Sequence, residues 1–359
     1  MPALNKLHAD LAAIPRLTAT RLRNLLERFK TAEAVLGARA QDLAEVEGVD
    51  VELAGAIAGY RRTPELGARI DRAREAGVWS ADWRDAAYPA ALRELRGMPT
   101  LLFGRGELCD DDRLAVAVVG TRRPSAYGQQ VAERLARDFV GHGVTVVSGL
   151  ARGIDTCAHR AAIAGGGRTI AVLGSGVDVP YPPENERLLG EVADHGAVLS
   201  EFGLGAEPMS TNFPRRNRIV SALSRAVIAV EAGERSGVLN TVAWAADQGR
   251  DVYAVPGRIT DQSSAGINRL LREGARPVLG AEDVLCDLGV ALHFEERQKL
   301  PLEEEEKNVI ALLSGDPQHV DEIAQMTELA MARLLGVLMQ LEVKGAVRQL
   351  PGKFFIRCY

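Results

Sequence analysis

Short, continuous apolar runs alternate with helical patterns between Arg113 and about residue 290. Six runs, each about five residues long and rich in Val and Ile, read LAVAVVG, VTVVSG, TIAVLGSG, AVLSE, AVIAVEA and DVYAVPG. Strands that are buried on both faces of a parallel sheet show this pattern. Helical segments such as GQQVAERLARDFVGHG and GVLNTVAWAADQG follow nearly every run. The pattern therefore predicts an α/β fold with a doubly wound, Rossmann-like parallel sheet.

Residues 1–78 have a helical pattern instead, with Leu22, Leu25 and Leu26 on one face. They predict a small all-α domain, which is SAM-like or helix-hairpin-helix-like because LAEVEGVDVELAGAIAGYR loosely resembles such a hairpin. The hairpin can offer backbone N–H groups to a DNA phosphate, or the segment can be a small packing domain. Residues 79–110, with Trp79 and Trp83, are too apolar for a free linker. We therefore assign 79–290 to the Rossmann-like domain with an N-terminal extension.

The last part of the chain begins with an acidic run, EERQKLPLEEEEK, which is typical of a solvated boundary. Three short helical patterns follow, and then a hairpin that turns through Pro351, Gly352 and Lys353. Helices followed by such a hairpin predict a C-terminal winged-helix domain over 300–359.

Composition narrows the classes of protein to which this chain can belong. Apolar residues make up 47% of the 359 residues, and the formal net charge is −5, so a nucleic-acid site must be a local basic patch. The four cysteines show neither C-x-x-C pairs nor zinc spacing, so we expect no metal site, no disulfide framework and a cytoplasmic location. The sequence has neither a signal-peptide pattern nor an apolar run of about 18 residues, so we expect no membrane span.

Polar chemistry is concentrated where the predicted strands end. The loops contain Gly120-Thr121-Arg122, Ser148-Gly149 with Arg152, Gly174-Ser175-Gly176 and Pro256-Gly257-Arg258. Glycines allow a ligand to approach the backbone, and arginines and helix N-termini bind phosphate, so these loops indicate a phosphate site rather than ordinary turns. Position 179 is Val where the dinucleotide fingerprint needs Gly, and no Walker A motif occurs. We therefore expect no nucleotide cofactor.

The segment Phe213-Pro214-Arg215-Arg216-Asn217-Arg218 adds an aromatic ring and three arginines at the start of a predicted helix. A basic track with an aromatic ring is typical of single-stranded DNA binding. We expect at least one of these arginines to pair with Glu201 or Glu231.

Catalytic interpretations of these residues fit the sequence less well than phosphate binding does. Ser148, Asp155 and His159 could suggest a hydrolytic triad, but Asp155 stands where a helix N-cap belongs and His159 follows it by one helical turn. Glu201 and Glu231 could form an acid/base pair, but they can equally hold arginines in position. We expect no catalytic residues.

In these residues the sequence resembles the DNA-processing protein A family, also called DprA or Smf. The resemblance covers about residues 80–285 closely and the flanking domains loosely. It is carried by motifs in a fixed order, and Thr121 stands where the family often has Ser. The motifs are Val119-Gly120-Thr121-Arg122, Ser148 to Asp155 with His159, Leu173 to Gly176 with Tyr181-Pro182, Ser200-Glu201, Phe213 to Ile219, Glu231-Ala232, Ser236-Gly237 with Thr241, Val255 to Gly257, and Gly266 to Asn268.

The resemblance implies a homodimer that binds and protects single-stranded DNA and helps to load the RecA recombinase during natural transformation. It also implies that Arg122, Phe213, Arg215 and Arg218 line the DNA pocket. The DNA-binding residues expected here are Gly120, Thr121, Arg122, Ser148, Gly149, Arg152, Gly174, Phe213, Arg215, Arg216, Asn217, Arg218, Ser236 and Gly237. Two alternatives are a nucleotide phosphoribohydrolase, although Ser236 to Thr241 lacks the glycine density of that class, and a winged-helix transcription regulator.

Overall fold

The computed structural model describes residues 2–290, 302–327 and 329–357. The chain divides into two compact units, residues 1–123 with 132–291, and residues 124–131 with 292–359. Within the described helices, none is both long and apolar enough to cross a membrane.

The larger unit contains a nine-stranded sheet in the order β1-β2-β6-β5-β4-β3-β7-β8-β9. Strands β3 to β9 are parallel to one another, as predicted. Their bounds are β3 Ala115–Val119, β4 Thr145–Ser148, β5 Thr169–Val172, β6 Gly196–Ser200, β7 Ala226–Ala229, β8 Asp251–Ala254 and β9 Arg276–Pro277. The six apolar runs thus form β3 to β8, and the predicted Rossmann-like fold class is confirmed.

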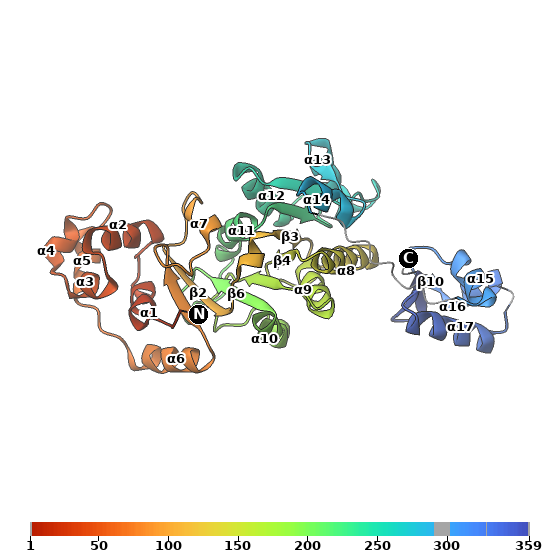
Figure 1. Ribbon diagram of the computed structural model, residues 1–359, viewed down its shortest axis with the longest axis horizontal. Helices are drawn as coiled ribbons and strands as arrows, with labels where there is room; N and C mark the ends of the chain where they lie inside the picture. The colour runs from red at the N-terminus through yellow and green to blue at the C-terminus, as the bar shows by residue number, and fades with distance from the viewer. Residues whose placement is uncertain (1, 291–301, 328, 358–359) are drawn as a thin grey trace. The chain divides into compact units, whose positions relative to one another are not determined.

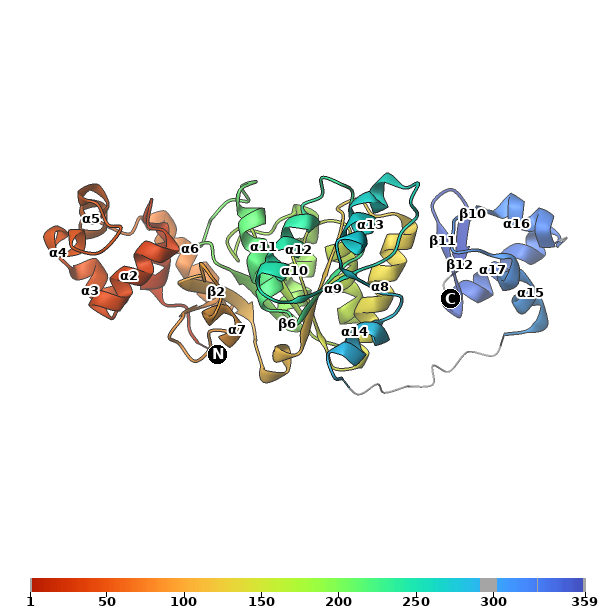
Figure 2. The same ribbon diagram turned by 90° about the horizontal axis from the view of Figure 1, so that it is seen from above.

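Helices cover both faces of this sheet (Figure 1). Their bounds are α8 Ala126–Gly141, α9 Ile154–Ala164, α10 Glu186–Asp194, α11 Asn212–Ala222, α12 Val238–Asp247, α13 Ala265–Arg272 and α14 Ala281–Asp287, with short 3₁₀ turns at Asp110–Arg113, Pro183–Asn185 and Gln262–Ser264. Along β5, Ile170 and Val172 join the core under α11 and α12, whereas Ala171 joins the core under α10. Figure 2 shows the sheet from the side of α11, α12 and α13. Burial on both faces explains why the strand sequences are continuously apolar.

The extension over residues 79–110 also joins the sheet. It forms β1 (Trp79–Asp82) and β2 (Leu101–Gly106), with the short α7 (Ala90–Arg93) between them, and β2 pairs antiparallel with β6. The Trp79 indole N–H donates to the Gly106 carbonyl over 2.8 Å, and its ring fills the space where a side chain at Gly104 would lie. The sequence predicted that this segment packs against the sheet, but not that it forms strands.

Six helices precede the sheet, and side-chain caps define several of their starts. They are α1 Lys6–Ala13, α2 Ala19–Phe29, α3 Ala32–Gly37, α4 Ala40–Ala44, α5 Val51–Ala58 and α6 Pro64–Glu75. Thr18, Thr31 and Asp50 accept N-cap hydrogen bonds from backbone N–H groups. The core of these helices also includes Leu101 and Phe103 of β2, so helices and sheet share one apolar core. The domain boundary at residue 78 stays a prediction.

The smaller unit has the predicted winged-helix elements. They are α15 Glu304–Leu312, β10 Gln318–His319, α16 Val320–Thr327, α17 Met331–Val343, β11 Val347–Leu350 and β12 Phe354–Arg357. Leu334, Leu338 and Leu341 of α17 are buried in its core. Positive φ angles at Gly352 (83°) and Lys353 (61°) turn the chain between β11 and β12, where the hairpin was predicted.

Candidate nucleic-acid interface

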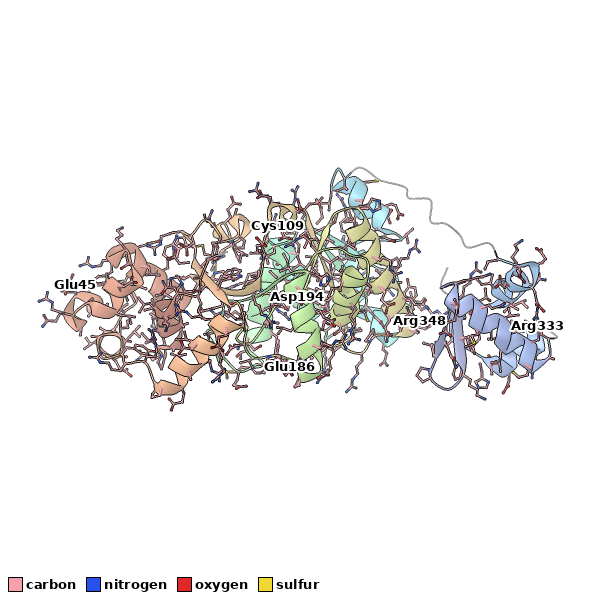
Figure 3. All side chains as sticks on the ribbon, turned by 60° about the horizontal axis from the view of Figure 1, so that its bottom comes forward. Glu45, Cys109, Glu186, Asp194, Arg333 and Arg348 are labelled. Carbon is pink, nitrogen blue, oxygen red and sulfur yellow. The ribbon has the colours of Figure 1, made fainter. Side chains whose placement is uncertain are left out.

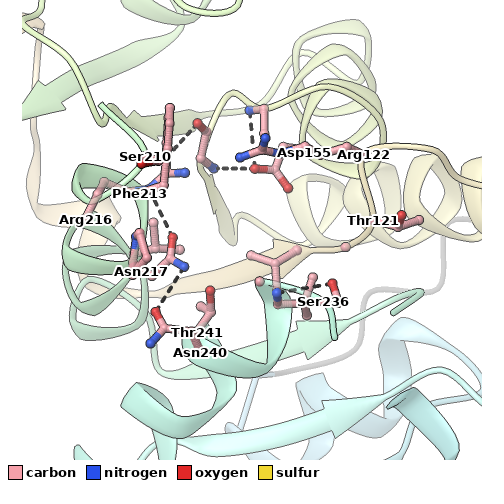
Figure 4. Close-up of a pocket in the computed structure, with 18 of the residues that line it drawn as sticks. Thr121, Arg122, Asp155, Ser210, Phe213, Arg216, Asn217, Ser236, Asn240 and Thr241 are labelled. Carbon is pink, nitrogen blue, oxygen red and sulfur yellow. Dashed lines mark hydrogen bonds between the residues drawn. The ribbon is translucent and has the colours of Figure 1, made fainter. Parts of the chain in front are cut away.

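A pocket of about 700 Å³, here called the main pocket, lies at the carboxyl ends of β3, β4, β5 and β7 (Figure 4). The strand order reverses between β3 and β7, and ligands of open parallel sheets bind at such a reversal. The main pocket is lined by Val119, Gly120, Thr121, Arg122, Arg123, Gly149, Ala151, Asp155, Tyr181, Pro208, Ser210, Phe213, Pro214, Arg216, Asn217, Val220, Ser236, Gly237, Val238, Asn240 and Thr241.

Three of the predicted glycines leave room for side chains that pack against them, which the sequence did not reveal. A Cβ at Gly120 would collide with Ile154, and one at Gly149 would collide with the guanidinium of Arg216. A Cβ at Gly174 would lie 2.8 Å from Cδ1 of Phe213. These glycines therefore admit side chains of the pocket itself, whereas the sequence analysis explained them by the approach of a ligand.

Arg216 is buried and organises the loop after β4. Its Nη1 donates to the Gly149 carbonyl over 2.6 Å and also to the Val172 carbonyl. Burial lowers the pKa of Arg216 to about 10, although the negative charge of Asp155 opposes that shift. Burial raises the pKa of Asp155, and nearby Arg216 opposes that shift too. We interpret this arginine as a support of the pocket wall.

Asp155 does not cap α9, contrary to the sequence-based interpretation. The N-cap is Gly153, with a φ of 77°, and Asp155 lies in the first turn of α9. Its Oδ2 accepts hydrogen bonds from the N–H groups of Gly149 (3.1 Å) and Ala151 (3.3 Å). The carboxylate thus closes the loop between β4 and α9.

An exposed arginine and two aromatic rings form a cluster at the main pocket. The Arg122 guanidinium lies 5.3 Å from the centre of the Phe213 ring, and the Tyr181 and Phe213 ring centres are 5.4 Å apart. Within the described residues, Arg122 has no carboxylate within 4.0 Å. This cluster combines a free cation with an aromatic surface.

Two more of the predicted arginines lie on a different side of α11 from the main pocket. Arg215 and Arg218 each donate to Oε2 of Glu201, over 2.8 and 2.7 Å, and the Glu201 side chain is only 2% exposed. Arg218 is buried, which lowers its pKa, while half of the Arg215 side chain is exposed. The expectation that at least one of these arginines pairs with Glu201 or Glu231 is confirmed. Pro214 is the third residue of α11.

The remaining predicted residues divide into three groups. Asn217, Ser236, Gly237, Gly120, Thr121 and Gly149 line the main pocket, and Asn217 Nδ2 donates to Asn240 Oδ1 over 3.3 Å. Arg152 and Gly174 line a small recess beside it, where Arg152 pairs with Glu184. Ser148 is fully buried, and its hydroxyl donates to the Val118 carbonyl over 2.7 Å.

Several polar or aromatic residues of the main-pocket lining are absent from the predicted set: Arg123, Tyr181, Ser210, Asn240 and Thr241. Helical spacing from Ser236 and Gly237 could have indicated Asn240 and Thr241, because residues three and four apart share a helix face. Tyr181 and Ser210 lie on long loops, whose course the sequence pattern does not predict.

Ser148, Asp155 and His159 do not form a triad. His159 Nδ1 lies 2.7 Å from Thr169 Oγ1, and that hydroxyl donates to the Val146 carbonyl, so Nδ1 acts as the donor. Burial lowers the pKa of His159 to about 3. Its Nε2 is buried and has no hydrogen-bond partner in the described part of the chain. The predicted helix histidine is therefore satisfied at one nitrogen only.

Comparison with known proteins agrees with the fold and the motifs. The sequence model of the DNA recombination-mediator protein A family matches residues 80–289, and that of the DprA winged helix domain matches residues 295–353. The Smf protein of Synechocystis sp. is 32% identical over 375 residues, which cover 94% of each chain. The DNA processing protein DprA of Streptococcus pneumoniae is 45% identical over 203 residues, which cover 56% of this chain and 72% of that one.

Two solved structures are similar as well. The X-ray structure of DprA from Streptococcus pneumoniae superimposes with a TM-score of 0.68 at 35% identity, covering 81% of this chain and 100% of that one. The structure of DNA processing protein A from Helicobacter pylori, described as having a unique single-stranded DNA binding mode, gives 0.53 at 30% identity and covers 60% of this chain and 97% of that one. The family match spans more than half of the sequence, and the similarity to Smf extends over nearly all of it. The chain therefore belongs to the DNA recombination-mediator protein A family.

Proposed function

We propose that this protein binds single-stranded DNA in the main pocket and acts in DNA processing. The observation that carries the proposal is the cluster of Arg122, Phe213 and Tyr181. A partly exposed ring accepts a base of any identity by stacking, and a free guanidinium beside it binds the adjacent phosphate. The Helicobacter pylori relative, whose structure concerns single-stranded DNA binding, supports the same chemistry.

The rest of the pocket suits a sugar-phosphate backbone. Thr121, Ser210, Ser236 and Thr241 bring hydroxyl groups to its lining, and Arg123 adds a second exposed cation. Hydroxyl and arginine donors recognise phosphate oxygens without reading base edges. Binding should therefore depend little on sequence.

The wider role that we propose comes from the family. It includes protection of incoming DNA, help in loading the RecA recombinase during natural transformation, and a homodimer formed through the α/β domain in the cytoplasm. A strand-exchange assay with RecA and strands coated by a single-strand-binding protein tests the loading role. Failure of the protein to accelerate RecA filament formation would contradict it.

We also propose that the main pocket performs no catalysis. Asp155 is held by two loop amides, and Glu201 lies outside the main-pocket lining and is paired with two arginines, so neither is placed as a free base in the main pocket. The test is incubation of the purified protein with nucleoside monophosphates. Release of free base that disappears in a Glu231→Gln variant would instead favour the phosphoribohydrolase alternative.

A titration of labelled single-stranded and blunt duplex DNA over a salt series tests the main proposal. We expect tighter binding of the single strand, with a log–log salt slope of about −0.7 for each phosphate contacted. Equal affinity for the duplex at matched salt would contradict the proposal.

A further inference from the structure

A second cleft, of about 310 Å³, lies beside α11, and we call it the α2 cleft. Arg16, Thr18 and Leu22 line it from the N-terminal helices, and Glu201, Phe202 and Arg215 line it from the α/β region. All these residues belong to the larger compact unit. Nothing in the sequence motifs assigned a role to Phe202 or to Arg16.

The α2 cleft repeats the arrangement that carries the main pocket. The Arg215 guanidinium lies 5.5 Å from the centre of the Phe202 ring, compared with 5.3 Å between Arg122 and Phe213. Phe202 is partly exposed, and so is half of the Arg215 side chain. Each cleft therefore presents an aromatic ring beside an accessible guanidinium.

The charges of the α2 cleft favour a nucleobase at its inner end and a phosphate at its rim. Glu201 is nearly buried there, and its Oε1 accepts no hydrogen bond within the described residues. A carboxylate repels phosphate, but it tolerates a neutral base. The accessible cation is Arg215, and Arg16 lies in exposed ion pairs with Asp50 and Glu52 that contribute little stability and can exchange.

The two clefts are adjacent along one helix. Phe213 of the main pocket and Arg215 of the α2 cleft are two residues apart in the first turn of α11. Successive residues of a helix rise by only about 1.5 Å. Because residues two apart project from different sides of a helix, a DNA strand that occupies both clefts crosses the first turn of α11.

We propose that the α2 cleft is a second nucleotide-binding subsite, in which Phe202 stacks a base of the same DNA strand and Arg215 binds its phosphate. The N-terminal helical region then forms one wall of the DNA path through Arg16 and Thr18. This proposal rests on single-stranded DNA binding by the main pocket and extends it.

Fluorescence anisotropy with oligothymidylates of increasing length tests the subsite on the full chain. For the shortest strands that bind, we expect a Phe202→Leu variant to match the unsubstituted protein. For longer strands we expect it to bind at least about fivefold more weakly, the factor for one lost stacked base. A Phe202→Tyr variant keeps the ring and should bind strands of every length like the unsubstituted protein.

A second variant tests the subsite by a fluorescence change rather than by a loss of binding. In a Phe202→Trp variant, long strands should quench the added tryptophan fluorescence, measured against the unsubstituted protein with its three tryptophans, and the shortest strands should not. The proposal is overturned if Phe202→Leu binds every length normally while Phe213→Leu weakens binding, because the main pocket then acts alone. If the unsubstituted protein binds no oligothymidylate, the main proposal fails and the subsite fails with it.

Discussion

At the scale of single residues, the arginines of the main pocket fall into two classes. Arg122 is exposed and lies against a ring, whereas Arg216 is 4% exposed and donates to two backbone carbonyls. An exposed arginine contributes to ligand binding, and a buried one contributes to the fold. Substitutions at the two positions should therefore have different effects.

Replacing Arg122 with alanine should weaken binding of single-stranded DNA by about 1 kcal/mol, roughly fivefold, and leave the melting temperature unchanged. The matched control is Arg187→Ala, which removes an arginine that is 91% exposed and lies on α10, outside the main-pocket lining. An affinity titration beside a thermal melt measures both effects. Equal losses in the two variants would mean that only the overall charge matters.

Replacing Arg216 with alanine should instead destabilise the fold by about 3 kcal/mol. Two buried carbonyls lose their donor, and the buried Asp155 loses its nearest counter-charge. Urea unfolding of the full chain measures the change in the free energy of unfolding. An unchanged midpoint would show that water or another donor replaces the guanidinium.

Stability should also fall below neutral pH because of His159. Its pKa is about 3 in the folded state and about 6.5 when unfolded, so the unfolded state takes up the proton as the pH falls below 6.5. At pH 5.5 this costs about 1.4 kcal/mol relative to pH 8. Asp155, with its raised pKa, acts in the opposite direction at lower pH. Unfolding at both pH values, repeated with His159→Gln, should show a smaller difference in the variant.

At the scale of elements, helical periodicity explains how α11 serves two clefts. Phe213, Arg216 and Asn217 face the main pocket, while Arg215 and Arg218 reach Glu201. The sequence places these side chains side by side, but a turn of 3.6 residues directs neighbours to different sides. One short segment thereby lines two neighbouring clefts.

The helix α17 has the position of a recognition helix but not its surface. Met331, Leu335, Met339 and Val343 repeat every four residues and are exposed. The exposed Arg333, which is labelled in Figure 3, pairs with Glu305. Reading of base edges needs polar side chains, so this face suits a protein contact better than a DNA groove. This argues against a transcription regulator.

We therefore expect a Leu335→Gln, Met339→Gln variant to keep its affinity for single-stranded and duplex DNA. Both side chains are exposed, so the fold should tolerate the change. Gel shifts with both DNA forms provide the measurement. A clear loss of duplex binding would place α17 on DNA after all.

At the scale of the whole molecule, the formal net charge of −5 confines DNA binding to local sites. The larger unit also ends its sheet at β9, whose outer side has no partner strand in the described residues. Leu279, just after β9, and Ile259 are 79% and 94% exposed. An exposed strand edge with apolar neighbours is suited to pairing with a second copy.

If the proposed homodimer uses this edge, Leu279→Glu should shift the full chain towards monomer, because the dimer would bury two added charges. Light scattering over a concentration series measures the mass. Arg272→Glu, another exposed position at the end of α13, is the control for charge. A dimer that persists in the Leu279 variant would place the interface elsewhere.

The sequence alone determined the fold class and the edge of the sheet at which the main pocket lies. Strands buried on both faces must be continuously apolar, and strand ends of a parallel sheet must meet at one edge, so the six runs and their loops were sufficient. The expectation that at least one arginine pairs with Glu201 or Glu231 followed from charge alone. These inferences depend on local pattern and on topology, which the sequence contains.

Only the tertiary structure decided which groups are buried and which remain free. Arg122 and Arg216 are equivalent in sequence terms, yet one stacks on Phe213 and the other lies under the loop after β4. The strands β1 and β2, the structural need for Gly149, and the juxtaposition of Phe202 with Arg16 and Thr18 depend on contacts between residues far apart in the chain. Local periodicity does not specify such contacts, because packing of distant segments fixes the burial of each side chain.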